Sequence, residues 1–593
     1  MANFLSKQEA FNEMLKGHYA LGMIESGSEK RQLEFDALNE PILWSHNGAD
    51  LMTLLKGFRG HPNYKLDYLT DLTAYVHDAH HSFVVVYQIY SPSTHVRLRL
   101  KLLIREGEVV PSVTSLFASA DWNEREVYDM FGIVFGNHPD LRRIMMDERF
   151  VGHPLRKDYD IKQRMPFPDN IMISMDRCPT NERGEFLPCE NKESNSAPRE
   201  SLFDVYNPSV LLNLGPSHPA MHGTLRVMCR INGETIEDAK CEPGYLHRAI
   251  EKLGETNTYH QWFVYTDRLN YCSALNNNIA YAMAVENLLG LTLPERAVWI
   301  RMMCMELSRI IDHLICVAIN ALDMGAMTIF WHLYRWREEA YTMIEGMCGM
   351  RLTTTYARIG GLSYDLYEGF HKDLAHFCDG MLRALDDMEV MLTRNRIWID
   401  RTKGVGKLSA KQALALSATG PVLRASGVDI DLRRDRPYYF YEDVDFDVVI
   451  ASNGDVFDRY LVRTEEMRQS VRLLRQFQAR IKPGPIWVDN PQVRIPEKID
   501  VYTKMEVLIH HFKIFMEGID VPPGEAYTAV EGPNGELGFY IVSRGGPKAW
   551  RLRIKSPSFM HYQLTEKTLA GERIPDAISI LGSVNIVAGE LDR

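Results

Sequence analysis

The sequence predicts an α+β N-terminal domain joined to a mainly α C-terminal domain with small β-sheets. The chain has 593 residues, and because single cores rarely grow beyond about 250 to 300 residues, two or more domains are expected. Short apolar and alternating runs typical of strands occupy about the first 160 residues. Beyond Arg248, apolar residues recur with helical spacing for about 250 residues.

Two strands are expected in the N-terminal domain. Residues 83–87 (Phe-Val-Val-Val-Tyr) form a continuous apolar run. Residues 96–102 (Val-Arg-Leu-Arg-Leu-Lys-Leu) alternate apolar and charged side chains. This second pattern is typical of a half-exposed antiparallel strand.

A dense stretch of charges and aromatics follows at residues 122–132 and continues in His-Pro-Asp-Leu-Arg-Arg at 138–143. One interpretation is a short helix and turn held by ion pairs. The other is a docking surface, because such mixtures are also common at interfaces. Composition does not decide between them.

A polar stretch without apolar period, residues 178–200, predicts a linker. We therefore divide the chain into an N-terminal domain with the start of the linker at 1–184, a linker at 185–207 and a C-terminal domain at 208–593. The C-terminal domain should open with strands at 210–214, 224–231 and 235–240, because Asn232-Gly233 is a hairpin turn signal.

Helices should dominate the rest of the C-terminal domain. Residues 292–295 (Thr-Leu-Pro-Glu) match a capping box. An apolar stripe at spacings of three and four follows, which predicts a bundle helix and consists of Ile300, Cys304, Leu307, Ile311, Leu314 and Ala318. Short strands are expected again at 538–543 and 549–554, with one or two short helices.

Charge and hydropathy exclude several classes of function. The formal charge is −11 and the pI is near 6.0, so nucleic-acid binding is not expected. A membrane span needs about 20 largely apolar residues, but the best candidate, residues 298–327, holds six charged or histidine side chains. The N-terminus has no signal-peptide pattern, so we expect the chain in the cytoplasm or on that side of a membrane.

The nine cysteines do not form a recognisable ligand set. The closest pair is 11 residues apart and no Cys-x-x-Cys occurs. A zinc ribbon or an ordinary iron–sulfur site therefore has no local ligands. Cysteines used as small apolar fillers in a reducing compartment are the simple interpretation.

The most informative segment is the loop at residues 215–223, Gly-Pro-Ser-His-Pro-Ala-Met-His-Gly. Proline and glycine fix its backbone, so His218 and His222 should lie on a rigid turn. The spacing His-x-x-x-His is that of a zincin, but Pro219 and Ala220 occupy positions that need a helix and a glutamate, so zinc is not expected. His218 alone is expected to hydrogen-bond loop backbone.

Two distant residues matter together with His222. Tyr271 lies in Asp-Arg-Leu-Asn-Tyr (267–271), and Asp323 lies near the end of a long predicted helix. Taken singly, each residue is more often structural, since a tyrosine in a bundle is usually core with a bonded hydroxyl. Sequence distance alone does not bring them together.

Several motifs carry a resemblance to a known family. The sequence resembles the 30-kDa (C) and 49-kDa (D) subunits of respiratory complex I, in the order of a fused bacterial C/D subunit. The C-like motifs are Glu-Arg-Glu-Val-Tyr-Asp-Met-Phe-Gly-Ile (124–133) and residues 138–143. The D-like motifs are residues 215–223, Tyr-Leu-His-Arg-Ala-Ile-Glu-Lys (245–252), residues 267–271, Leu-Asp-Met-Gly-Ala-Met-Thr (322–328), residues 458–470 and Glu-Leu-Asp-Arg (590–593).

This resemblance implies a component of proton-translocating NADH:quinone oxidoreductase. It implies that His222 and Tyr271 hydrogen-bond a quinone headgroup, that Asp323 pairs with His222, and that His218 and Met221 also contact the quinone. These types suit quinone reduction, because a titrating imidazole and a phenol are both proton donors. The resemblance further places Arg248 close to an iron–sulfur cluster of the B subunit.

The resemblance also implies what the chain lacks and where it acts. No cofactor, metal or cluster is expected on this chain, whereas NADH, FMN and iron–sulfur clusters would belong to partner subunits. The implied C-terminal fold is that of a nickel–iron hydrogenase large subunit whose metal site is lost. The implied partners are the B, I and membrane H subunits, with a peripheral location on the cytoplasmic face of the bacterial inner membrane.

Two alternatives stay open at this point. A nickel–iron hydrogenase-type large subunit would need two Cys-x-x-Cys pairs, and nickel analysis would test it. A purely structural scaffold is compatible with a composition that has no redox ligands. Variants of His222 and Tyr271 that assemble normally would separate a scaffold from a quinone site.

Overall fold

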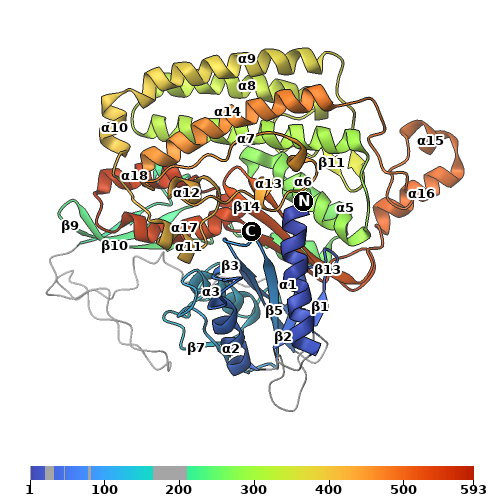
Figure 1. Ribbon diagram of the computed structural model, residues 1–593, viewed down its shortest axis with the longest axis horizontal. Coiled ribbons are helices and arrows are strands. Elements are labelled where there is room, and N and C mark those ends of the chain that lie inside the picture. The colour runs from blue at the N-terminus through green and yellow to red at the C-terminus, as the bar shows by residue number, and fades with distance from the viewer. Residues whose placement is uncertain (1, 21–32, 46, 78–81, 164–209) are drawn as a thin grey trace.

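The computed structural model describes residues 2–20, 33–45, 47–77, 82–163 and 210–593, and Figure 1 shows their arrangement. The predicted linker at 185–207 lies outside the described residues, as do the predicted boundaries beside it. Below, residues 2–163 are called the N-terminal part and residues 210–593 the C-terminal part.

A five-stranded mixed sheet forms the N-terminal part, with the strand order β1-β2-β5-β4-β3. β2 and β5 are parallel and the other neighbours are antiparallel. The strands are β1 (Leu33–Phe35), β2 (Pro41–Ser45), β3 (Tyr68–Val76), β4 (Phe83–Tyr90) and β5 (Arg97–Ile104). The other elements are α1 (Ala2–Ala20), α2 (Gly48–Arg59), α3 (Ala120–Phe131) and the short parallel pair β6 (Val110–Pro111) and β7 (Phe135–Gly136).

Both predicted strands of this part are confirmed as β4 and β5, which pair antiparallel. The expected half-exposure of the second strand is wrong. Its charged side chains Arg97, Arg99 and Lys101 are 6%, 2% and 3% exposed. The alternating residues of β5 form one apolar face and one charged face. Both faces are buried, because a second sheet covers the charged one.

Two three-stranded antiparallel sheets belong to the C-terminal part. The first contains β8 (Val210–Leu214), β9 (Arg226–Asn232) and β10 (Thr235–Glu242), and it confirms the predicted hairpin, with Gly233 at a φ of +61°. The second contains β13 (Gly524–Gly532), β14 (Gly535–Ser543) and β15 (Arg551–Lys555), near the strands predicted at 538–543 and 549–554. A two-residue pair, β11 (Ala357–Arg358) and β12 (Gly361–Leu362), completes the strands.

Four long helices pack side by side as the predicted bundle (Figure 1). They are α7 (Glu295–Asp323), α8 (Met327–Cys348), α9 (Phe370–Met388) and α14 (Val456–Arg480). The predicted capping box is wrong. Pro294 is the N-cap residue of α7 and makes no side-chain cap, so Thr292 lies outside the helix.

Shorter helices surround this bundle. They are α4 (Ile250–Thr256), α5 (Tyr259–Thr266), α6 (Ala274–Leu289), α10 (Arg396–Thr402), α11 (Ala410–Ala415), α12 (Gly420–Ala425), α13 (Leu432–Asp435), α15 (Lys498–Thr503), α16 (Met505–Met516), α17 (Pro557–Leu569), α18 (Ile574–Val584) and α19 (Ala588–Leu591). In the described part of the chain, no helix is both long and apolar enough to cross a membrane.

The charged face of β5 packs against the sheet β13–β15. Arg97 contacts Glu536 at 2.5 Å, and Arg99 and Lys101 contact Glu525 at 2.9 and 2.6 Å. Apolar contacts continue the same interface, because side chains of β3 and β4 share a small core with side chains of β13 and β14. The two parts therefore meet through a sealed surface of paired charges and apolar side chains.

Helix α3 contains most of the stretch at residues 122–132, for which the sequence left two interpretations, an ion-paired helix and a docking surface. The structure shows features of both. Its Asp129 is buried and pairs with Arg143 at 2.6 Å within the N-terminal part. Its Glu126 pairs with Arg553 and Arg593 of the C-terminal part at 2.5 and 3.0 Å. The stretch is thus an ion-paired helix that docks onto the other part of the same chain.

We expect the two parts to stay associated after the chain is cut. A protease site introduced within residues 185–207 should leave 1–184 and 208–593 co-eluting at physiological salt, because buried ion pairs are screened much less than exposed ones. Size-exclusion chromatography after cleavage measures this. Separation of the halves at low micromolar concentration would contradict it.

The interface should depend strongly on Glu525. Glu525→Gln leaves the buried Lys101 without the opposite charge that lies 2.6 Å away, and removing one charge of a buried pair costs about 3–5 kcal/mol. Association of the cleaved halves should weaken accordingly, and adding Lys101→Met should recover part of the loss. Asp379→Asn, which removes an exposed ion pair with Arg475 inside the C-terminal part, is the control and should leave association unchanged.

Candidate functional site

The loop between β8 and β9 fixes His218 through its own backbone. Pro219–Met221 form one 3-10 turn, labelled η2, and His218 is the residue before it. The Ala220 backbone N–H donates to His218 Nδ1 at 3.2 Å. The local hydrogen bond expected for His218 is confirmed.

His222 and Met221 lie in different environments although they are neighbours. Met221 is fully buried and packs in the core with Leu225 and Val227. His222 is exposed and adopts the left-handed conformation with a φ of +53°, a region where histidine is enriched among non-glycine residues. Its ring makes no hydrogen bond to any residue that the structure describes. The turn thus presents His222 outward, and a quinone contact of Met221 stays a prediction.

Asp323 is the last residue of α7 and lies near both loop histidines. Partial burial raises the pKa of its carboxyl group, and the charges of His222 and His218 act in the opposite direction. The structure therefore brings these three sequence-predicted residues together. No hydrogen bond or ion pair joins Asp323 to either ring among the described residues, so the direct pairing of Asp323 with His222 stays a prediction.

Tyr271 begins a 3-10 turn, Tyr271–Ser273, labelled η3, which Asn270 caps. The Asn270 Oδ1 atom accepts from the backbone N–H groups of Cys272 and Ser273 at 3.0 and 3.2 Å. Tyr271 is 44% exposed, and its hydroxyl has no hydrogen-bond partner within the described ranges. Partial burial raises its pKa to about 12, helped by Cys272, so the phenol is a neutral donor at physiological pH.

Arg248 lies beside Tyr271 and belongs to the loop between β10 and α4. Its Nη2 atom donates to the carbonyl oxygens of Arg268 at 2.8 Å and Gly589 at 3.3 Å. Its charge opposes the rise in the pKa of Tyr271. Gly589 approaches this turn so closely that a Cβ atom there would lie 2.6 Å from the carbonyl oxygen of Arg268.

The chain end fixes the Arg248 loop from the other side. The two carboxylate oxygens of Asp592 accept from the backbone N–H groups of Gly244 and Leu246, each at 2.8 Å. Arg593 is buried and pairs with Glu126 of the N-terminal part at 3.0 Å. The position of Arg248 is thus tied to the interface between the two parts.

The predicted site residues form two groups that share helix α7. His218, His222 and Asp323 lie at its C-terminal end, whereas Tyr271 lies near Asp312 and Arg248 lies near Tyr271. Asp312 and Asp323 are 11 residues apart, roughly 16 Å along a helix axis at about 1.5 Å per residue. No hydrogen bond connects the two groups in the part of the chain that the structure describes.

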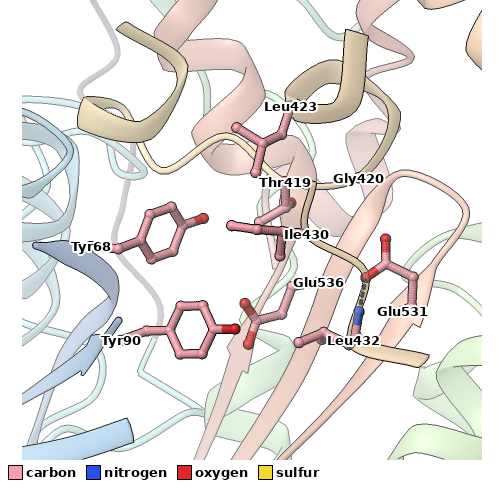
Figure 2. A pocket seen from close by; sticks show the side chains of 9 residues that line it. All are labelled: Tyr68, Tyr90, Thr419, Gly420, Leu423, Ile430, Leu432, Glu531 and Glu536. Carbon is pink, nitrogen blue, oxygen red and sulfur yellow. Dashed lines mark hydrogen bonds between the residues drawn. The ribbon is translucent and has the colours of Figure 1, made fainter. Parts of the chain in front are cut away.

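The two best-formed cavities do not coincide with these groups. One lies between the two parts and is lined by Tyr68, Tyr90, Leu423, Glu531 and Glu536 among others (Figure 2). The other lies near the chain end. Each has a volume of about 10 Å³, which holds about one water molecule. Neither could hold a quinone headgroup.

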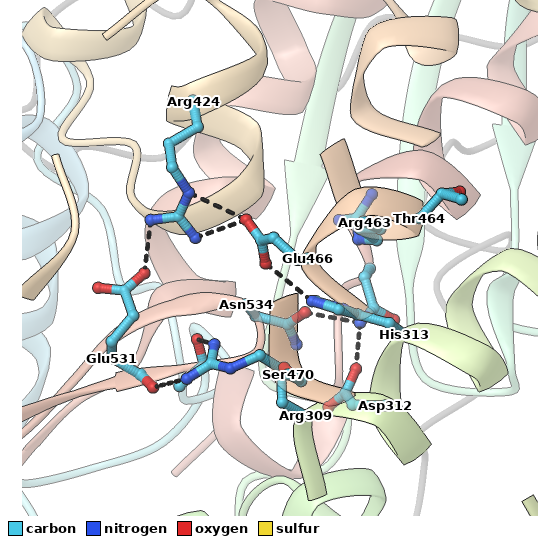
Figure 3. A network of polar contacts seen from close by, with 12 residues as sticks. Arg309, Asp312, His313, Arg424, Arg463, Thr464, Glu466, Ser470, Glu531 and Asn534 are labelled. Atoms are coloured by element: carbon cyan, nitrogen blue, oxygen red, sulfur yellow. Dashed lines mark hydrogen bonds and ion pairs between the residues drawn. The ribbon is translucent and has the colours of Figure 1, made fainter. Parts of the chain in front are cut away.

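A buried polar network occupies the interior side of α7 (Figure 3). His313 Nε2 lies 2.9 Å from Glu466, and Arg424 contacts Glu466 and Glu531 at 2.8 Å each. Burial alone would raise the pKa of Glu466, but Arg424 and His313 hold it well below its usual range. Paired this way, the charges are stable in the core. Among the described residues, no three His, Cys, Asp or Glu side chains are grouped to hold a metal ion.

Sequence reasoning missed several residues that shape the site. Asn270 could have been found, since an asparagine before a helical turn is a cap signal. Asp312 was one of the six charged or histidine residues at 298–327 that were counted against a membrane span, although a buried aspartate in an apolar stripe needs donors. The contacts of Gly589 and Asp592 had no sequence signal, because their partners are more than 300 residues away.

Comparison with known proteins identifies two families along the chain. Residues 45–165 match the family described as respiratory-chain NADH dehydrogenase, 30 Kd subunit. Residues 323–593 match the family described as respiratory-chain NADH dehydrogenase, 49 Kd subunit. The second match begins at Asp323 and does not include His222, Arg248 or Tyr271.

Individual relatives cover more of the chain. The NADH-quinone oxidoreductase C/D subunit of Bdellovibrio bacteriovorus is 45% identical over 511 residues, 86% of this chain and 88% of its own length. The C/D 2 subunit of the Aquifex aeolicus enzyme is 40% identical over 86% of this chain and 88% of its own length. The D subunit of the Geobacter sulfurreducens enzyme is 49% identical over 64% of this chain and 98% of its own length. The chain therefore belongs to the family of fused C/D subunits of NADH-quinone oxidoreductase, the respiratory complex I.

Proposed function

We propose that this chain forms the quinone-reduction site of NADH-quinone oxidoreductase together with the B subunit. The observation that carries this proposal is the exposure of two proton-donating side chains, His222 and Tyr271, on turns of fixed backbone. The two cavities described above, in the part of the chain that the structure describes, are water-sized and lie away from these side chains. A quinone bound at these side chains would need a wall from another subunit.

The residue types suit the chemistry. Reduction of a quinone to a quinol takes two electrons and two protons, so each carbonyl oxygen needs a donor as negative charge develops. Tyr271 would donate to one oxygen and His222 to the other, with His218 and Met221 beside the headgroup. Asp323 would pair with His222 and fix the orientation and tautomer of its ring.

Electrons would come from outside this chain. We propose that they arrive from an iron–sulfur cluster of the B subunit close to Arg248, and that NADH and FMN bind to other subunits. The I subunit and the membrane H subunit would be further neighbours, on the cytoplasmic face of the bacterial inner membrane. The C-terminal part would then share its ancestry with the nickel–iron hydrogenase large subunit, without the metal site.

Tyr271→Phe should reduce quinone reductase activity in an assembled complex by roughly 10²-fold, because it removes one donor to the developing oxyanion while keeping the ring. The measurement is NADH:quinone turnover in membranes with equal subunit content. Tyr502→Phe, at a tyrosine 75% exposed on α15, is the matched control and should leave turnover unchanged. Full activity of the Tyr271 variant with intact upstream electron supply would count against the assignment of Tyr271 to the quinone headgroup.

Asp323→Asn should reduce quinone reductase activity in an assembled complex, because the substitution removes the carboxylate that would hold the His222 ring in place. The measurement is the rate with quinone and with an artificial acceptor that bypasses the quinone site. Asp387→Asn, which alters an exposed pair with His332, is the control and should leave both rates unchanged. An equal loss with both acceptors would make Asp323 structural.

A further inference from the structure

Asp312 is a fully buried carboxylate in the middle of α7 whose two oxygens are both held by amides. The Asn270 Nδ2 atom donates to Oδ2 at 3.0 Å, and the Asn585 Nδ2 atom donates to Oδ1 at 2.6 Å. No lysine, arginine or histidine within the described ranges forms an ion pair with it. A buried charge without a cation is held only by such donors, so these two hydrogen bonds must persist.

Asn270 uses both ends of its amide. Its Oδ1 atom accepts from the backbone N–H groups of Cys272 and Ser273, and its Nδ2 atom donates to Asp312. The Asn277 side chain also donates to the Asn270 carbonyl oxygen at 3.1 Å. A rotation of the Asn270 side chain would therefore break the cap and the contact with α7 together. The turn that carries Tyr271 is locked to α7 at Asp312.

The other oxygen of Asp312 reaches a second fixed point. Asn585 ends α18 in the left-handed conformation with a φ of +59°. Its amide also donates to Asn534, at the turn between β13 and β14, at 2.6 Å. Figure 3 shows Asp312 and Asn534 in the same network of buried polar side chains. Asp312 thus joins the Tyr271 turn to α18 and to the sheet that packs against the N-terminal part.

We propose that Asp312 is a positioning residue for quinone reduction: its carboxylate fixes Asn270, and Asn270 fixes the turn from which Tyr271 presents its hydroxyl to the quinone. This inference rests on the proposed role of Tyr271 at the quinone. The negative charge of Asp312 also favours the hydrogen-bond-donating form of Tyr271, because Asp312 is among the groups that raise the pKa of Tyr271. A protonated phenol is the form that donates.

The hydrogen-bond pattern allows a reciprocal exchange. In Asp312→Asn, the new NH₂ group on residue 312 would face the NH₂ group of either Asn270 or Asn585. The hydrogen bond to that asparagine is then lost. Adding Asn270→Asp restores a donor on residue 312 and an acceptor on residue 270, and a carboxylate still caps the turn. Asn270→Ser is a second single variant, because its hydroxyl keeps the cap acceptor but does not reach Asp312.

Asp312→Asn and Asn270→Ser should each lower kcat for quinone by about tenfold to a hundredfold in assembled membranes, since a small misplacement of a reacting group has effects of this size. Turnover with an artificial acceptor should stay unchanged. The reciprocal double variant should recover to within about threefold of the parent. Hydrogen exchange at the amides of Cys272 and Ser273 should quicken in both single variants and slow again in the double variant.

A double-mutant cycle with Tyr271→Phe tests whether Asp312 affects quinone turnover through Tyr271. If Asp312 acts through Tyr271, Asp312→Asn should cause less than about threefold further loss in the Tyr271→Phe background. Asp458→Asn is the matched control. Asp458, in the first turn of α14, is also buried, and its carboxylate accepts hydrogen bonds from amide groups of Ser452 and Asn453. Any loss that it causes should be the same in both backgrounds.

The outcomes separate this inference from the proposed function. Unchanged turnover in Tyr271→Phe would overturn the quinone role of Tyr271, and with it the catalytic consequence of Asp312. A large loss in Tyr271→Phe, with an equal and additive loss from Asp312→Asn, would overturn the positioning role alone. Unchanged hydrogen exchange at Cys272 and Ser273 in Asp312→Asn would overturn it too. If Asp312→Asn does not assemble, Asn270→Ser and the reciprocal double variant carry the same test.

Discussion

The pairing of buried charges between the two sheets is the constraint on which the rest of the structure depends. β5 presents three cations on one face, and β13 and β14 supply Glu525 and Glu536 opposite them. The N-terminal part alone would keep the pair of Arg99 with Asp36 at 3.1 Å, but Arg97 and Lys101 would lose Glu536 and Glu525 in a surface that also contains apolar side chains. Desolvating an unpaired charge costs several kcal/mol, so the two parts are folded as one unit in this register.

This interface reaches the candidate site through a short path of contacts. Burial would raise the pKa of Glu251, but Arg551, Arg553 and Arg593 lower it to about 2, so it stays charged. Arg593 and Asp592 are adjacent, and Asp592 holds the loop that contains Arg248. A short path of contacts therefore connects the interface with Arg248. The N-terminal part supports the site without contributing a predicted donor to it.

Local patterns predicted those elements whose partners lie nearby in the chain. The hairpin at Asn232-Gly233 and the strand at 83–87 were predicted because a turn signal and an apolar run decide them locally. The exposure of the strand at 96–102 was predicted wrongly, because Glu525 lies 426 residues from Arg99. An alternating pattern shows that two faces differ, and does not show what covers the charged one.

The same limit applies to the site. The loop at 215–223 was predicted as a rigid turn that carries two histidines, since proline and glycine act through their own backbones. Asp323 near His222 came only from the family resemblance, because nothing in either segment encodes their approach. Asp312 went unnoticed, since its donors Asn270 and Asn585 lie 42 and 273 residues away.

Gly589 shows how a residue without a side chain becomes indispensable. Its Cα atom fills the gap between the chain end and the backbone carbonyls of Arg268 and Leu269, with no room for one more carbon. The distance between Gly589 and these carbonyl oxygens is therefore set by the covalent geometry of glycine. It does not depend on pH or ionic strength. Any side chain at position 589 would push the Arg248 loop and the Tyr271 turn apart, so that both would be displaced. A defect that biochemistry would assign to quinone chemistry would then have a purely steric origin.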